Sequence, residues 1–408
     1  MSNFPFGCGS TPVVTHGLTM DLNPEYANAR RYKNQDLTFR LIDRTTLPRV
    51  FVDLLTFDGN APALTWYDGD ARSLHLDYRE LVRQVSLMAR WLFSGCGLRR
   101  GDRLIIISSN CPEAFVAHLA SMSLGAITVP VNNVESERVF RFIVEQVSPR
   151  AIVTGRRVGT DLQTAQGCKS FQLPILPLAE MPDESGSWLW PCEDVAPDDP
   201  AVILFTSGTT SSPKGVCLSH YNLMVNAEGL ARTHNLAIHR NHMCTLPLFH
   251  ANAFGYSMVG SVYSGSHVVL CDGFPGNSIW SFLRDERIDI LSAVPEILKI
   301  LSQISVPRQT LPDLKYVVSA AAPLSKGVAL EFCTKTAIDI HQGYGLSECA
   351  GCSKGVFRTL PASGYHFWAG TGASDVDGEN QARCPRREIP AIRKAKLWER
   401  SCHCEALG

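Results

Sequence analysis

A loop rich in hydroxyl groups connects two short apolar runs near the middle of the chain. Residues 203–205 read Ile-Leu-Phe and predict a buried strand, and residues 216–218 form the second run. Gly208 allows close backbone approach, Lys214 adds a mobile positive charge, and six neighbouring side chains offer hydroxyl groups: Thr206, Ser207, Thr209, Thr210, Ser211 and Ser212. A loop of this composition can wrap a polyphosphate.

A Walker phosphate loop is excluded by two residues of this segment. That motif requires Gly-x-x-x-x-Gly-Lys followed by Ser or Thr, at the start of a helix. Here Pro213 stands where the second glycine should be, and Gly215 follows the lysine. The segment is therefore a phosphate loop of another kind or a polar linker.

Several further segments accompany this loop. They cover residues 78–81, 97–102, 246–255 (Leu-Pro-Leu-Phe-His-Ala-Asn-Ala-Phe-Gly), 319–324 (Ser-Ala-Ala-Ala-Pro-Leu) and 342–348 (Gln-Gly-Tyr-Gly-Leu-Ser-Glu). Together with the hydroxyl-rich loop they follow the order of motifs in the adenylate-forming (AMP-binding) superfamily. The chain resembles that superfamily over residues 74–351. The form of its motifs is most similar to that of the acyl-CoA synthetase/ligase type.

The resemblance implies ATP and Mg²⁺ as cofactors, with CoA as co-substrate in the complete family. A carboxylate attacks the α-phosphorus of ATP and expels pyrophosphate, so the protein mainly positions groups and stabilises charge. Lys214, His250 and Glu348 are the implied catalytic residues, with His250 lining the acyl pocket. Glu348 and Thr210 are the implied Mg²⁺ ligands, since this ion prefers oxygen.

The resemblance also implies a set of nucleotide-binding residues. Tyr344 offers a flat face to adenine, and Ser347 keeps a hydroxyl group for the α-phosphate. The full set is Thr206, Ser207, Gly208, Thr209, Thr210, Lys214, Ala321, Ala322, Pro323, Tyr344, Gly345 and Ser347. Outside these motifs, Glu348 would be read as a solvated acid and His250 as a core histidine.

Composition bounds the class of protein. The chain has 408 residues, 45% of them hydrophobic and 19% charged, with a net charge of -1. These values are typical of a globular protein with two or three compact units and give no sign of a nucleic-acid partner. No secretory signal, membrane span or C-terminal targeting signal is evident, so we expect a cytoplasmic protein.

The 14 cysteines lie mostly in apolar runs and are interpreted as reduced thiols. Cys349 and Cys352 have metal-ligand spacing, but their possible partners, Cys402 and Cys404, follow about fifty residues later. Structural zinc usually takes paired ligands at close spacing. The pattern is therefore a weak indication of zinc.

The order of apolar runs predicts an α/β fold. Short buried strands alternate with amphipathic helices, which indicates mainly parallel sheets covered by helices on both faces. We expect a helix from residue 76 to 92 and strands at 103–107, 127–131, 151–153, 201–205, 268–270, 288–291 and 316–318. The expected organisation is a lead-in (1–45), a first α/β subdomain with a connector (46–195), a second α/β subdomain carrying the phosphate, adenine and Mg²⁺ motifs (196–352), and a tail (353–408).

The tail differs in composition from the rest. Ile, Leu, Val and Phe supply only 9 of its 56 residues, which predicts disorder. Thr371-Gly372 is followed by Ala373, whereas the family has Thr-Gly-Asp, whose carboxylate holds the ribose. No Gly-rich lysine motif follows. The resemblance thus implies truncation before the β-rich subdomain and the mobile C-terminal domain, with an aberrant tail from a frameshift or altered splicing; a genuine tail is the alternative.

Three functions are consistent with the sequence. The first is an ATP-dependent carboxylic acid:CoA ligase by lineage, impaired or inactive in this chain. The second is an adenylating enzyme that passes the acyl group to a carrier protein or an amine. The third is a non-catalytic remnant that binds a nucleotide or an acyl group.

Overall fold

The computed structural model describes residues 31–32, 35–36, 42–157, 173–181, 195–206, 213–237, 240–304 and 311–350. Contacts divide the chain into two units. In the first, the described residues form an antiparallel pair of strands, β1 (Arg31–Tyr32) and β2 (Gln35–Asp36). The remaining elements belong to the second unit. The expected disordered tail, residues 353–408, lies outside the described residues.

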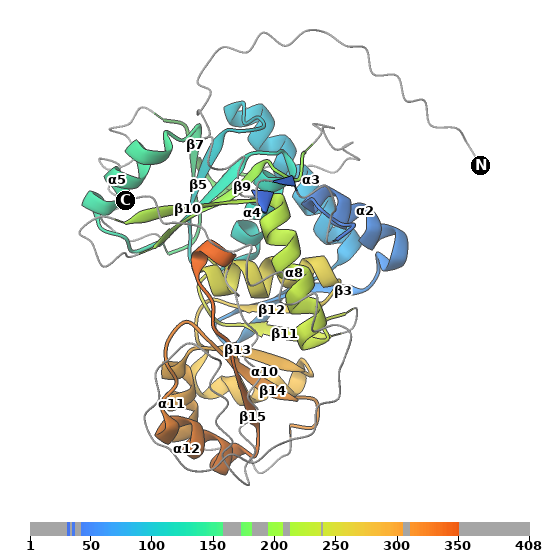
Figure 1. The fold of residues 1–408 in the computed structure, drawn as a ribbon, viewed down its shortest axis with the longest axis vertical. Helices are drawn as coiled ribbons and strands as arrows, with labels where there is room; N and C mark the ends of the chain where they lie inside the picture. Colours follow the sequence, from blue (N-terminus) through green and yellow to red (C-terminus); the bar gives the residue numbers. More distant parts are fainter. Residues whose placement is uncertain are drawn as a thin grey trace. The chain divides into compact units, whose positions relative to one another are not determined.

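Two sheets organise the second unit (Figure 1). The six-stranded sheet has the order β10 (Lys214–Ser219), β9 (Pro200–Thr206), β6 (Ile127–Val131), β5 (Arg103–Ile107), β7 (Ala151–Thr154), β8 (Ile175–Pro177). The seven-stranded sheet has the order β15 (Asp339–Gln342), β14 (Tyr316–Ser319), β13 (Ile290–Ala293), β11 (Asn241–Cys244), β12 (His267–Cys271), β3 (Pro62–Asp68), β4 (Ala71–Asp77). β10 and β4 pair antiparallel with their neighbours, and the other described pairs are parallel. The expected α/β fold with mainly parallel sheets is confirmed.

Helices connect and cover these strands. The α-helices of the second unit's described residues are α2 (Leu47–Asp58), α3 (Tyr78–Cys96), α4 (Pro112–Ser123), α5 (Glu137–Val147), α8 (His220–His234), α9 (Ser261–Ser264), α10 (Ile279–Asp285), α11 (Pro295–Gln303) and α12 (Lys326–Thr336). Three 3₁₀ turns, η1 (Leu178–Glu180), η3 (Gly276–Ser278) and η4 (Ser347–Cys349), and a π-helix, η2 (Asn252–Gly260), complete the set. No described helix is long and apolar enough to cross a bilayer.

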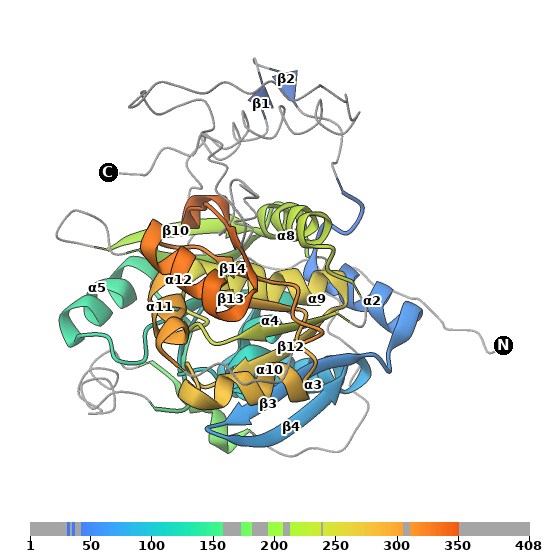
Figure 2. The ribbon, with the colours of Figure 1, turned by 90° about the horizontal axis from the view of Figure 1, so that it is seen from below.

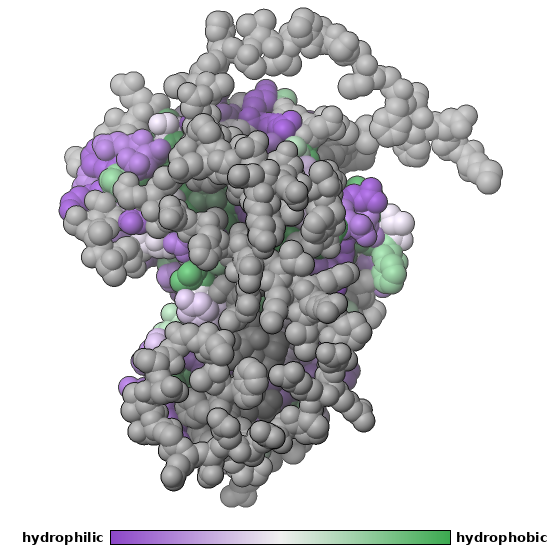
Figure 3. Space-filling view, in the orientation of Figure 1, coloured by the Kyte–Doolittle hydropathy of each residue, from purple (hydrophilic) through white to green (hydrophobic). Residues whose placement is uncertain are grey.

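The core follows from the patterning of the helices. Nearly every residue of α4 is buried, and the main hydrophobic cluster around it includes residues of both sheets, such as Ile106 and Leu64. A second cluster joins β5 and β6 to the apolar side of α5, including Phe140 and Ile143. Hydrophilic residues gather over α5 on the opposite side (Figure 3). The sheets are therefore linked through a shared core.

Helix α3 illustrates how local sequence sets an element's bounds. The Asp77 side chain accepts a hydrogen bond of 2.7 Å from the backbone N–H of Glu80 and caps the helix. Gly97 ends it in a left-handed conformation, with φ of 67°. The predicted start at residue 76 was early by two positions, because Leu76 and Asp77 still pair with β3 as part of β4. Figure 2 shows β4 alongside β3.

Each of the two sheets contains strands from both sides of residue 196, the expected start of the second subdomain. β3 and β4 come from the first predicted segment, yet β3 pairs with β12 of the seven-stranded sheet. β9 and β10 come from the second segment and lie in the six-stranded sheet. Within the connector, residues 175–177 form β8 at a sheet edge. Apolar runs mark the strands, but sheet membership depends on pairings between distant segments.

The strand expected at 288–291 is β13, which begins at Ile290. Ile288 and Asp289 precede it, and their backbone groups bond to α10, to the start of β11 and to the residue before β14. The Asp289 N–H donates to the Asn241 carbonyl at 2.9 Å, and the Asp289 carbonyl accepts from the Lys315 N–H at 2.9 Å.

Candidate nucleotide site

The segments at residues 319–324 and 342–348, here called the adenine loop and the tyrosine motif, begin side by side. They follow β14 and β15, which are parallel neighbours with Ser319 opposite Gln342. The Gly343 N–H donates to the Ser319 carbonyl at 2.9 Å, and the Ala320 N–H donates to the Ala293 carbonyl at 3.3 Å. Ligands of open α/β sheets bind beyond the carboxyl ends of the strands. The two motifs therefore occupy the position where such a ligand is expected.

The adenine loop presents small residues to solvent. Ala321, Ala322 and Pro323 are all exposed. Ala321 adopts φ of 72°, a conformation uncommon for a residue with a Cβ atom. Tyr344, in the adjacent motif, is 57% exposed. An exposed aromatic ring beside a small-residue loop provides the flat, accessible surface that a purine ring requires.

The turn that carries Glu348 lies against β10. Ser347 and Glu348 belong to η4 and are half-buried. Cα pairs between η4 and β10 lie within 8 Å. β10 begins at Lys214, which pairs with Thr206, the last residue of β9. The two strands that flank the hydroxyl-rich loop therefore pair with each other at the edge of the sheet where the Glu348 turn lies.

The centre of the hydroxyl-rich loop, residues 207–212, lies outside the described residues. Ser207, Gly208, Thr209 and Thr210 therefore remain predicted binding residues. Lys214 and Thr206 are described and half-buried. A close approach of Glu348 to the loop itself remains a prediction. The position of the Glu348 turn against β10 supports this prediction.

Glu348 is chemically suited to a magnesium ion. Within the described residues its carboxylate has no cationic side chain as an ion-pair partner. Mg²⁺ is commonly bound through one or two carboxylates together with substrate phosphates. No group of three or more His, Cys, Asp or Glu residues in the described ranges could hold a metal by itself. Three of the four cysteines of the weak zinc pattern, Cys352, Cys402 and Cys404, lie outside those ranges.

His250 follows β11 on a tight turn. Its N–H donates to the Pro247 carbonyl at 3.0 Å, and its ring centroid is 4.4 Å from that of Phe249. The ring is exposed, yet desolvation by surrounding protein atoms lowers the pKa of His250. A neutral imidazole is therefore favoured at this position near pH 7.

Asn110 fixes the backbone before His250, and sequence patterns did not reveal it. Its side-chain amide donates to the carbonyls of Leu246 and Cys271 at 2.9 and 3.0 Å and accepts from the Leu248 N–H at 2.9 Å. Asn110 is 3% exposed and follows β5 of the other sheet. It joins the carboxyl ends of strands from the two sheets. The sequence carries no local signal for this role, because the partners of Asn110 lie at least 136 residues away along the chain.

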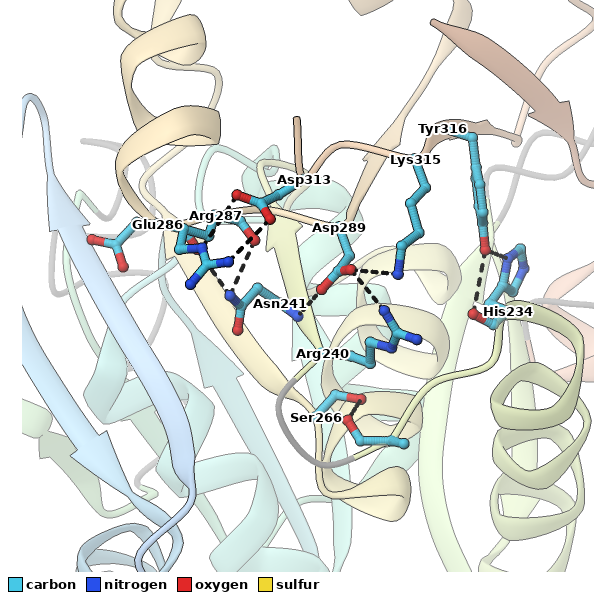
Figure 4. Close-up of polar contacts among 11 residues, drawn as sticks. His234, Arg240, Asn241, Ser266, Glu286, Arg287, Asp289, Asp313, Lys315 and Tyr316 are labelled. Carbon is cyan, nitrogen blue, oxygen red and sulfur yellow. Dashed lines mark hydrogen bonds and ion pairs between the residues drawn. The ribbon is translucent and has the colours of Figure 1, made fainter. Parts of the chain in front are cut away.

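A second polar cluster lies at the opposite strand ends (Figure 4). Asp289 is 8% exposed and contacts Arg240 at 3.0 Å and Lys315 at 2.7 Å, and it accepts a hydrogen bond of 3.0 Å from the Asn241 N–H. These residues precede or begin β11, β13 and β14, whereas the motifs follow the carboxyl ends. The cluster's charges are paired with one another. We therefore assign it a structural role.

Replacing Asp289 tests this assignment. Asp289→Ala leaves Arg240 and Lys315 without their shared carboxylate, so we expect the free energy of unfolding to fall by about 1–3 kcal/mol. Nucleotide affinity should stay unchanged. Urea denaturation and ATP titration measure the two quantities. Asp285→Ala, which removes an exposed acid paired with Arg284, is the control and should change stability by less than about 0.5 kcal/mol. Weakened ATP binding in Asp289→Ala would contradict a purely structural cluster.

Comparison with known proteins decides the family. The AMP-binding enzyme family matches residues 56–386. The chain belongs to the AMP-binding enzyme family. The match begins before the first motif at residue 78 and extends beyond the last at 348. It confirms the resemblance inferred from the order of the motifs.

Curated relatives are named as CoA ligases. The chain is 29% identical over 326 residues to 4-coumarate--CoA ligase-like 3 of Arabidopsis thaliana, covering 74% of the chain and 58% of that protein. It is 25% identical over 307 residues to the long-chain-fatty-acid--CoA ligase FadD13 of Mycobacterium tuberculosis, covering 71% of the chain and 58% of that protein. The chain thus spans little more than half the length of these relatives.

Solved structures show the same fold. The inhibitor-bound N-terminal domain of FACL13 from Mycobacterium tuberculosis superposes with a TM-score of 0.67 at 22% identity, covering 77% of the chain and 82% of that structure. ATP-bound MatB from Rhodopseudomonas palustris gives 0.66 at 23% identity, covering 79% of the chain and 63% of that structure. The described body of this chain therefore has the fold of the N-terminal domain of adenylate-forming enzymes.

Proposed function

We propose that this chain binds ATP with Mg²⁺ and a carboxylic acid, as an acid:CoA ligase by lineage. The observation that carries the proposal is the juxtaposition of three motifs. The adenine loop and the tyrosine motif leave adjacent parallel strands, and the Glu348 turn that ends the second motif lies against β10, which leaves the hydroxyl-rich loop at Lys214. The family membership and the names of the relatives support the same conclusion.

The chemistry assigns a role to each group. A carboxylate oxygen attacks the α-phosphorus of ATP, the bond to pyrophosphate breaks, and an acyl-adenylate forms. Lys214 and the hydroxyl-rich loop would stabilise charge on the phosphates, and Tyr344 would lie against the adenine. Glu348 and Thr210 would hold Mg²⁺, which neutralises charge on phosphate oxygens. His250, with its lowered pKa, would face the acid as a neutral hydrogen-bonding group.

For the 408-residue chain itself, we propose that nucleotide binding persists while acyl-CoA formation does not. The binding motifs are present up to Glu348. The sequence after it contains no match to the family's ribose carboxylate, since Ala373 follows Thr371-Gly372, and no match to its C-terminal lysine. Loss of one charge-assisted hydrogen bond costs roughly 1.5–3 kcal/mol, or one to two decades in affinity.

The test has three readouts on the full chain. We expect a fluorescent ATP analogue with Mg²⁺ to bind weakly, acid-dependent pyrophosphate exchange to be very slow, and CoA thioester to be absent over short, long and aromatic acids. Robust thioester formation would show that the tail supplies the missing groups. Exchange without CoA dependence would favour transfer to a carrier protein or an amine. No nucleotide binding at all would overturn the proposal.

A further inference from the structure

The turn that carries Glu348 is anchored from two sides. On one side, the side-chain amide of Asn226 in α8 donates a hydrogen bond of 3.0 Å to the carbonyl of Cys349, the residue after Glu348. Asn226 is 4% exposed, and its bond to the half-buried Cys349 is partly shielded from water. The hydrogen bond restrains the peptide group between Cys349 and Ala350, which directly follows Glu348 in the turn.

On the other side, the π-helix η2 provides a close contact. A Cβ atom at Gly255 would lie 2.2 Å from the carbonyl oxygen of Ala350. Ala350 is 2% exposed and adopts φ of 58°, where the chain reverses after η4. The Ala350 N–H donates to the Ser347 carbonyl at 3.0 Å, so the turn is closed on itself as well. Only a glycine lets the two backbones approach this closely.

The anchor at Asn226 also links two of the motifs. Helix α8 follows β10 directly, with Ser219 as its cap, and β10 starts at Lys214 beside the hydroxyl-rich loop. η4, the orange-red turn at the end of the coloured chain in Figure 1, lies against β10 and contacts α8. The hydrogen bond to Cys349 therefore connects the segment that continues from the phosphate-binding loop to the turn that bears the metal ligand.

We propose that Asn226 is a positioning residue for the metal site, acting through the Cys349 carbonyl to set the Glu348 carboxylate against the ATP phosphates. The inference rests on the proposed function, because it assigns Glu348 to Mg²⁺. Asn226 itself touches neither nucleotide nor metal. Its loss should weaken the contribution of Mg²⁺ to nucleotide binding and spare the contacts with adenine.

The test measures affinity for a fluorescent ATP analogue with and without Mg²⁺. In the wild-type chain Mg²⁺ should strengthen binding, and Glu348→Gln should remove most of that gain. Asn226→Ala should reduce the gain about tenfold, the lower end of the effects seen when outer partners of metal ligands are removed. Its affinity without Mg²⁺ should match the wild type. In the double variant the two losses should not add, since both act on one carboxylate.

Asn241→Ala is the matched control. It removes the same amide, whose Nδ2 donates to the carbonyls of Glu286 and Arg287 at 3.0 and 3.1 Å, but at the opposite strand ends. This variant should be destabilised and keep the full Mg²⁺ gain. A full gain in Asn226→Ala, or losses that add in the double variant, would overturn the positioning role.

Hydrogen exchange provides a second measurement that needs no ligand. Peptides covering residues 343–350 should exchange faster in Asn226→Ala than in the wild type and remain unchanged in Asn241→Ala. Unchanged exchange in Asn226→Ala would overturn the inference. If the wild-type chain shows no Mg²⁺-dependent binding, the proposed function fails, and the exchange result alone decides whether Asn226 anchors the turn.

Discussion

Mild acid should strongly destabilise this chain between pH 6.5 and 5.5. Burial lowers the pKa of His250 and His341, and it lowers the pKa of five other histidines further, to about 3 for His118, His242 and His267 and to about 4 for His220 and His234. Below pH 6.5 the unfolded chain binds protons at these positions and the folded chain does not. Stability is therefore complete above pH 6.5 and is lost as the pH falls towards the folded pKa values.

The expected loss is large. Each buried histidine costs about 1.4 kcal/mol for each pH unit below 6.5. At pH 5.5 the five groups together remove roughly 5–7 kcal/mol, against a total of 5–15 kcal/mol for a typical domain. Urea denaturation at pH 8.0, 6.5 and 5.5, followed by circular dichroism, measures this change. The pKa values of Glu80 and Glu228 are lowered from 4.5, so these two carboxylates titrate below this window.

His220→Leu isolates one of these groups. His220 is fully buried at the start of α8, and neither ring nitrogen has a hydrogen-bond partner among the described residues. The variant should retain stability at pH 8.0 and lose about one fifth less free energy between pH 6.5 and 5.5 than the wild type. A free energy of unfolding that does not change over this range in the wild type would show that these histidines are accessible to protons in the folded state.

The sequence predicted the residues that could bind the ligand better than it predicted the strand pairings and contacts that position them. Each of the motifs at residues 203–220, 319–324 and 342–348 is a continuous stretch of sequence. Their composition and their order were therefore sufficient to indicate the family. Strands β5, β6 and β9 could be predicted because they are short, buried and bounded by turn residues. The placement of β3 in the seven-stranded sheet could not, since its partner β12 lies about two hundred residues away and periodicity carries no information about pairing.

The anchors of the site depend on the same kind of distant contact. In the sequence, Asn226 is an ordinary polar residue. Its role becomes visible only from its hydrogen bond to Cys349, which joins α8 to η4. Asn110 acquires its role only when the ends of β5, β11 and β12 meet. Gly255 lies within a predicted motif, but the requirement for glycine comes from Ala350, far along the chain. The predicted ligand-binding residues occur in local sequence motifs, whereas the residues that position these motifs are recognised only from contacts between distant segments.

Gly255→Ala should disrupt the Glu348 turn. The new Cβ atom would lie 2.2 Å from the Ala350 carbonyl oxygen, a backbone atom that cannot rotate away as a side chain would. Either η2 or the turn after Glu348 must move. Overpacking of this kind costs typically 1–3 kcal/mol. We therefore expect a lower unfolding midpoint in urea together with a loss of the Mg²⁺-dependent part of ATP binding.

Gly229→Ala is the matched control for this substitution. Gly229 is an exposed position within α8, and a Cβ atom there would meet no described atom within 4 Å. Alanine at a helix-interior glycine without steric conflict should stabilise the protein by about 0.5–1 kcal/mol. The same chemical change thus has opposite expected signs at two glycines of neighbouring helices. If Gly255→Ala were as stable as the wild type and bound ATP with an unchanged Mg²⁺ gain, the close approach of η2 to Ala350 would have no part in placing Glu348.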